Sequence, residues 1–158
     1  MRFALYDRRA AVLYAHRWAY GRNPAFYDYE HLGGDCTNFA SQCIYAGSGV
    51  MNFTPTFGWY YIDPDQKAPA WTGVPYLYNF LVREEKTEGP AAHPCELGDL
   101  RPGDLLFFWN SGRTRIYHTG IWLGGGKYIH ASSSAGQVVV SGWSDWAKNS
   151  FSHGKRVY

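Results

Sequence analysis

The sequence predicts an α+β domain, with helices in the first half and an antiparallel β-sheet in the last third. Two patterns predict this fold class. Before residue 90, apolar side chains recur at helical spacing; after residue 100, short β-rich runs alternate with glycine and proline turns. A chain of 158 residues fits one domain, taken here as residues 1–158, and is long enough to build a hydrophobic core without disulfide bonds.

Three helices are expected, in residues 7–20, 36–45 and 74–86. The first keeps its apolar side chains on one face and ends before Gly21 and Pro24. The second begins at Cys36, and Gly47 and Gly49 are expected to close it. Residues 51–72, between the second and third helices, are expected to be irregular because prolines and glycines interrupt them.

Four short strands are expected after the helices. Their predicted ranges are 104–109, 117–123, 128–131 and 138–141. The turn at residues 124–126 consists of three glycines, so the second and third of these strands are expected to form a hairpin.

Composition and charge exclude several functions. The net charge is +2 and the sequence pI is about 8.4, with no basic run, so no nucleic-acid partner is expected. No apolar run approaches the roughly 20 residues of a membrane helix, and residues 1–9 lack the hydrophobic core of a signal peptide. The three cysteines form neither a disulfide framework nor a zinc motif. We therefore expect a monomer without stable membrane insertion, metal or cofactor.

Cys36 is the candidate nucleophile. It stands at the first turn of the expected second helix, after two glycines and Asp35. A helix N-terminus lowers the pKa of a thiol through its partial positive charge, and its free N–H groups can bind an oxyanion. An ordinary buried cysteine at a capped helix start is the competing interpretation. Cys43 and Cys95 lack this setting and are expected to have no catalytic role.

Two histidines on the expected hairpin are the candidate base and its orienting group. If Gly125 and Gly126 make the turn, His118 and His130 lie nearly opposite each other, within reach of a shared hydrogen bond. A cysteine nucleophile needs a base, and that base needs a third group to fix its tautomer. Solvent-facing strand histidines are the competing interpretation.

These residues resemble those of bacterial cysteine hydrolases. Residues 102–108, 118–121 and 129–132 resemble the second half of the NlpC-type cell-wall cysteine peptidases. The first half is closer to a related family, the bacterial "putative amidase domain". The segments that carry this second resemblance are 6–12, 22–24, 33–39, 41–43, 58–61 and 71–73. Together the matches cover nearly the whole chain.

The resemblance implies a papain-like fold in which Cys36 and His118 form the catalytic pair. It implies a polar third residue on the strand after the histidine, which is His130, with Ser132 or Asp145 as alternatives. Asp35 is expected to cap the helix or to hold a substrate amine. Two aromatic residues of the irregular segment are further candidates for substrate binding: Trp59 and Tyr60.

The function implied is an amidase or peptidase that cleaves an amide bond of a bacterial cell-wall peptide through a thioester. The resemblance also favours an extracellular or cell-envelope location, although the chain shows no export signal. Two alternatives share the fold. An acyltransferase would use the same thioester and would be favoured by an apolar tunnel, whereas a non-catalytic wall-binding domain would not need Cys36, His118 and His130 together.

Overall fold

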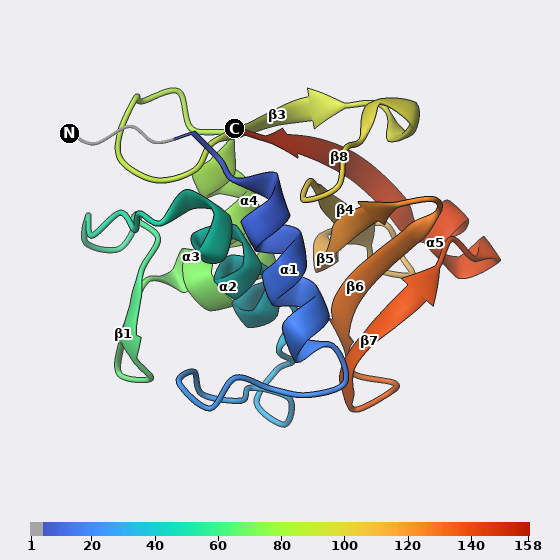
Figure 1. Ribbon diagram of the computed structural model, residues 1–158, viewed down its shortest axis with the longest axis horizontal. Coiled ribbons are helices and arrows are strands. Elements are labelled where there is room, and N and C mark those ends of the chain that lie inside the picture. Colours follow the sequence, from blue (N-terminus) through green and yellow to red (C-terminus); the bar gives the residue numbers. More distant parts are fainter. Residues whose placement is uncertain (1–4) are drawn as a thin grey trace.

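The computed structural model describes residues 5–158 and has an α+β architecture (Figure 1). Residues 1–4, part of the segment in which no signal peptide is expected, lie outside the described residues. The helices are α1 (Arg8–Trp18), α2 (Cys36–Ser48), α3 (Pro69–Thr72), α4 (Val74–Leu81) and α5 (Asp145–Ser150), with a 3₁₀ turn at Leu97–Asp99. The strands are β1 (Tyr61–Asp63), β2 (Gln66–Lys67), β3 (Ala92–Cys95), β4 (Leu105–Trp109), β5 (Ile116–Gly124), β6 (Lys127–Ser132), β7 (Gln137–Gly142) and β8 (Phe151–Val157).

One antiparallel six-stranded sheet organises the fold, with strand order β3-β8-β4-β5-β6-β7. The helices α1 to α4 lie on one side of this sheet, while α5 lies at its outer side (Figure 1). The larger core lies between those helices and the inward residues of the sheet, such as Phe107 and Ile121. A smaller cluster on the other face joins Phe108 and Tyr128 to Ala147 of α5. The sheet is therefore covered on both faces.

The helices α1 and α2 begin where the sequence predicts. Asp7 caps α1 by accepting a hydrogen bond from the Ala10 N–H at 3.0 Å. Helix α2 runs three residues past its predicted end at 45, because Gly47 continues the helix rather than ending it. A Cβ on Gly47 would lie 2.5 Å from the Tyr6 ring, so this glycine serves close packing, while Gly49 ends the helix with φ 66°.

Helix α4 ends at Leu81, before the predicted end at 86. The cause is Arg83, whose guanidinium donates to the carbonyl oxygens of Phe80, Thr87 and Pro90 and so holds the chain in a turn. Residues 51–72, predicted to be irregular, contain the short β1–β2 hairpin and the four-residue helix α3. Strands β4 to β7 match the four predicted strands, whereas β3, β8 and α5 were not predicted.

Asp104 joins the start of the chain to its last strand. Its buried carboxylate accepts hydrogen bonds from Arg8 Nη1 at 2.6 Å and Arg156 Nε at 2.9 Å, and from the Val157 N–H at 3.0 Å. Two arginines and a backbone donor satisfy this buried charge, so α1, β4 and β8 are held together at one point.

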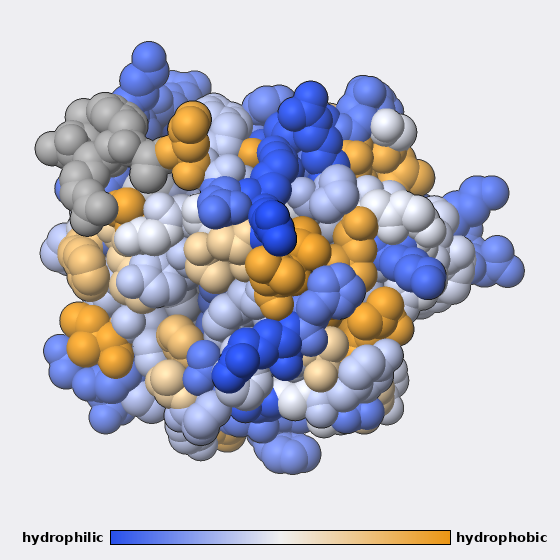
Figure 2. Space-filling view, in the orientation of Figure 1, coloured by the Kyte–Doolittle hydropathy of each residue, from blue (hydrophilic) through white to orange (hydrophobic). Residues whose placement is uncertain are grey.

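The visible surface is mixed rather than strongly apolar. Hydrophobic residues form small groups between hydrophilic ones on the face shown in Figure 2. Within residues 5–158, none of the helices is both long enough and apolar enough to cross a membrane.

Candidate active site

Cys36 is the first residue of α2, as predicted. Asp35 stands at the N-cap position, but its side chain makes no capping hydrogen bond. The Cys36 N–H donates to no acceptor among residues 5–158, so the helix start presents a free donor beside the thiol. This is the arrangement that an oxyanion hole requires.

Asp35 has a structural role, and both predicted roles for it are wrong. Its side chain is fully buried and accepts hydrogen bonds from Arg22 Nε at 2.8 Å, the Tyr29 N–H at 3.0 Å and Asn38 Nδ2 at 2.8 Å. A carboxylate bonded in this way cannot cap the helix or reach a substrate amine. Instead, it fixes the loop before α2, and with it the position of Cys36.

The Cys36 thiol lies against the backbone of β5 on both sides of His118. Its sulfur donates to the Tyr117 carbonyl oxygen at 4.0 Å and also contacts the Thr119 backbone. Residue pairing between β5 and β6 begins at Ile121 and Ile129 and continues toward Gly124. It does not reach Tyr117 or Thr119. The Trp122 N–H donates to the carbonyl oxygen of Asp104, just before β4, so the backbone groups of the odd-numbered residues of β5 face the β6 side. The sulfur therefore lies against backbone groups of β5 that are outside the paired part of β5 and β6.

His118 and His130 share a hydrogen bond, which confirms that prediction. His118 Nε2 lies 2.6 Å from His130 Nδ1. The two residues are not opposite each other, because the Ile121–Ile129 pair places Gly120, rather than His118, across from His130. Their side chains meet diagonally over Gly120, where a Cβ would lie 3.3 Å from the His130 Cβ. The missing side chain of Gly120 thus leaves room for the histidine pair.

Ser141 extends the pair into a chain of three groups and was not predicted. His130 Nε2 lies 2.8 Å from Ser141 Oγ, and Ser141 pairs with Tyr128 across β6 and β7. The alternative third residues are placed otherwise: Ser132 Oγ bonds to Ser134 Oγ, and Asp145 begins α5. The β6–β7 register would have indicated Ser141, because residues opposite Tyr128 share the face of His130.

The hydrogen bonds at both ring nitrogens of His130 limit which nitrogens of the two histidines carry a proton. If His118 Nε2 donates to His130 Nδ1, then His130 Nε2 carries a proton that it donates to Ser141 Oγ. His118 Nδ1 is then unprotonated in the neutral ring, and it has no hydrogen-bond partner among residues 5–158. It is the atom left free to accept a proton from a thiol.

Burial favours the neutral forms of Cys36, His118 and His130. It lowers the pKa of His118 to about 3, aided by the neighbouring His130, and lowers the pKa of His130 to about 4. Burial also raises the pKa of the Cys36 thiol, and hydrogen bonds from Thr37 and Thr119 offset this only in part. The sequence predicts a lowered thiol pKa at the helix start, whereas burial acts in the opposite direction and raises the pKa.

A groove lies beside the histidines, and we call it the His118 groove. Its volume is about 760 Å³. Its lining combines histidine, serine and aromatic side chains, chiefly His118, His130, Ser132, Ser133, Ser134, Ser141, Ser144, Tyr117 and Trp146. Ser133 also faces Gly34, where a Cβ would lie 3.6 Å from the Ser133 hydroxyl. The turn after β6 therefore approaches the loop before Cys36.

The other two predicted substrate contacts do not line this groove. Trp59 is fully buried and donates its Nε1 hydrogen to Ser41 Oγ at 3.0 Å, so its predicted contact with substrate is wrong. Tyr60 is half-buried and packs on Phe53, with ring centroids 5.5 Å apart. Cys43 is fully buried, and all three cysteines are free.

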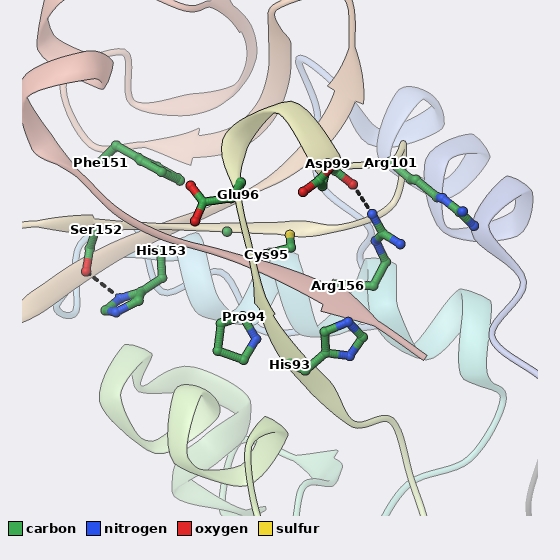
Figure 3. Close-up of a pocket in the computed structure, with 11 residues that line it drawn as sticks. His93, Pro94, Cys95, Glu96, Asp99, Arg101, Phe151, Ser152, His153 and Arg156 are labelled. Atoms are coloured by element: carbon green, nitrogen blue, oxygen red, sulfur yellow. Dashed lines mark hydrogen bonds between the residues drawn. The ribbon is translucent and has the colours of Figure 1, made fainter.

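A second groove is lined by one cysteine and two histidines, and we call it the Cys95 groove. Its volume is about 690 Å³, and β3 and β8 contribute His93, Cys95 and His153 (Figure 3). His93 and His153 lie on either side of Pro94 in Figure 3, and His153 Nδ1 bonds to its neighbour Ser152 at 2.6 Å. No hydrogen bond among residues 5–158 joins Cys95 to either histidine. Within the same residues, no group of three His, Cys, Asp or Glu side chains is placed to hold a metal ion.

Comparison with known proteins identifies the family. The family model described as "Putative amidase domain" matches residues 5–153. The chain belongs to this family. It is also 33% identical over 118 residues to the uncharacterized protein YhbB of Bacillus subtilis, covering 73% of this chain and 36% of YhbB.

Further similarities extend to peptidoglycan hydrolases. The chain is 32% identical over 79 residues to murein DD-endopeptidase MepH of Escherichia coli, covering 46% of this chain and 29% of MepH. It thus spans well under half of these two curated relatives. The NlpC/p60 domain of the peptidoglycan hydrolase SagA superimposes with a TM-score of 0.54 and 20% identity, covering 95% of this chain and 98% of that one. The predicted NlpC-type fold is confirmed.

Proposed function

We propose that this domain is a cysteine amidase or peptidase that hydrolyses an amide bond in peptidoglycan peptides through a thioester. The observation that carries the proposal is the 2.6 Å bond between His118 and His130 beside a cysteine at an uncapped helix start. The family, the NlpC-type fold and the similarity to a murein endopeptidase support the substrate class.

The reaction would begin from a neutral pair. The thiol, which donates to the Tyr117 carbonyl at rest, turns toward His118 Nδ1 and transfers its proton there. The sulfur attacks the amide carbon, and the resulting oxyanion accepts a hydrogen bond from the free Cys36 N–H. His118, held at Nε2 by His130, then gives the proton to the departing nitrogen as the C–N bond breaks, which leaves a thioester on Cys36.

Hydrolysis of the thioester completes the cycle. His118 Nδ1 takes a proton from water, the resulting hydroxide attacks the thioester carbonyl, and the C–S bond breaks. The proton returns to the Cys36 sulfur, and the product leaves as a carboxylic acid. An acyltransferase is not favoured, because the groove beside His118 is open and lined with serine hydroxyls rather than being an apolar tunnel.

The test uses muramidase-digested peptidoglycan as the substrate mixture, with products identified by mass spectrometry. We expect wild-type protein to release peptide fragments and Cys36→Ala to lose at least about a thousandfold of that activity with its folding retained. Cys95→Ala is the matched control and should stay active. Hydrolysis retained by Cys36→Ala would overturn the mechanism, while inactivity of the wild type on every fragment would overturn the substrate class.

A further inference from the structure

The His118 groove lies on one side of the reacting centre. Its lining comes from β5, β6, β7, the turn between β6 and β7, and α5, and it includes His118 and His130 but not Cys36. The thiol belongs instead to α2, whose residues pack against the other face of the sheet. The groove therefore begins at the histidines and does not include the nucleophile, although its Ser133 end approaches the loop before Cys36.

The reaction places the acyl half of a substrate on the α2 side and the amine half on the side of the His118 groove. The acyl half becomes bonded to the Cys36 sulfur and stays beside α2. The amine half receives its proton from His118, so its nitrogen must be next to that imidazole as the bond breaks. The groove beyond His118 is consequently where the rest of the leaving amine would lie.

The lining of the groove is uncharged and combines hydroxyl groups with apolar surface. It contains the hydroxyls of five serines, Ser132, Ser133, Ser134, Ser141 and Ser144, and no Lys, Arg, Asp or Glu among the described residues. Burial keeps both histidines neutral by lowering the pKa of each. A carboxylate brought here would lose hydration without meeting a cation, whereas an amide could bond to the hydroxyls.

Trp146 supplies an apolar surface in the same groove. The side chain is 41% exposed, and its ring lies edge-on to the His118 ring with centroids 6.1 Å apart. Packing against Phe108, with centroids 5.0 Å apart, holds this ring in place. A partly exposed, immobilised Trp beside serine hydroxyls suits a ligand with an aliphatic body and uncharged polar ends.

We propose that the His118 groove binds the leaving-amine half of the substrate and selects one whose own carboxyl group is amidated or peptide-bonded. This inference rests on the proposed function and adds a substrate preference to it. The enzyme would cleave within a peptide or next to an amidated residue, and would discriminate against a leaving amino acid that ends in a free carboxylate.

Amine transfer to the acyl-enzyme tests this preference directly. An added amine attacks the thioester carbonyl, the C–S bond breaks, the amine proton passes through His118 to the Cys36 sulfur, and an amide forms. Digested peptidoglycan serves as acyl donor, and glycylglycinamide and glycylglycine compete as acceptors with amines of similar basicity. We expect transfer to glycylglycinamide to exceed transfer to glycylglycine at least about fivefold, because an unpaired carboxylate is disfavoured.

A charge variant sharpens the result. Ser134→Arg places a cation in the groove and should shift the ratio toward glycylglycine at least threefold. Gln137→Arg makes a similar neutral-to-cationic change on the same hairpin, outside the groove lining, and should leave the ratio unchanged. Equal transfer to both amines, or no response to Ser134→Arg, would overturn this inference alone. Failure to form any acyl-Cys36, measured by mass spectrometry, would overturn the proposed function as well.

Discussion

The His118 groove and the Cys95 groove contain similar ingredients arranged in different ways. Each is associated with one cysteine and two histidines, and their volumes are about 760 and 690 Å³. In the first, the cysteine begins a 13-residue helix with a free N–H, and the histidines share a hydrogen bond. In the second, Cys95 ends a four-residue edge strand, and neither histidine bonds to it or to the other. The same residue types are therefore arranged as a candidate catalytic site in the first case and not in the second.

The charges around the two grooves differ as well. Arg101, Arg156, Glu96 and Asp99 line the Cys95 groove, and the side chain of Arg156 bonds to the Asp99 carbonyl (Figure 3). The described lining of the His118 groove has no such groups. A base must remain neutral to accept a proton, and a buried, uncharged setting keeps a histidine neutral. The comparison thus separates a site suited to proton transfer from an ordinary charged surface.

The largest expected difference is between histidine variants of the two grooves. His118→Ala should lower kcat about a thousandfold, because the reaction loses both its base and its acid. His93→Ala removes an exposed histidine from the Cys95 groove and should change kcat less than twofold. Steady-state hydrolysis of peptidoglycan fragments measures both, with circular dichroism to verify folding. Similar decreases of kcat in the two variants would contradict the assignment of catalysis to the histidines of the His118 groove.

A smaller loss is expected when the orienting histidine is removed. His130→Ala should lower kcat about tenfold to a hundredfold, since the 2.6 Å bond to His118 is lost but the base remains. His130→Asn keeps a hydrogen-bonding group on the strand and should recover part of the loss. A decrease as large as that of His118→Ala would mean that His130 takes part in proton transfer itself.

The pH profile should distinguish a neutral pair from a preformed ion pair. Because burial lowers the pKa of His118 to about 3, the base is already unprotonated near neutrality, and kcat/KM should decline only well below pH 6.5. The raised pKa of Cys36 places the alkaline limb above the ordinary thiol range. His130→Ala removes an imidazole whose protonation opposes protonation of His118, so the acid limb of the variant should move upward. An acid limb near 6.5 in the wild type would contradict this account.

The sequence predicted the positions of the candidate site residues better than their environment. The position of Cys36 at the start of α2 and the hydrogen bond between His118 and His130 both followed from local motifs and their spacing. The structural role of Asp35 was not predicted, because it depends on a hydrogen bond from Arg22, which lies 13 residues away in the sequence and contacts Asp35 only in the folded chain. The burial that raises the Cys36 pKa could not be predicted, because it depends on packing by distant segments. Strand β8 was missed because Ser152, Gly154 and Lys155 break the alternation expected of a half-buried strand.

The contact between Ser141 and His130 follows from the strand register and could not be found from a sequence motif. Of the variants considered, Ser141→Ala has the smallest expected effect. A 2.8 Å bond links it to His130 Nε2 and so favours the tautomer in which His130 Nδ1 accepts from His118. Ser141→Ala should lower kcat about threefold to tenfold, the contribution of one neutral hydrogen bond. Ser141→Thr, which keeps the hydroxyl, should restore most of the rate, whereas Ser152→Ala in the Cys95 groove should have no effect. Nitrogen NMR of the His130 ring measures the tautomer, and an unchanged tautomer in Ser141→Ala would limit Ser141 to lining the groove.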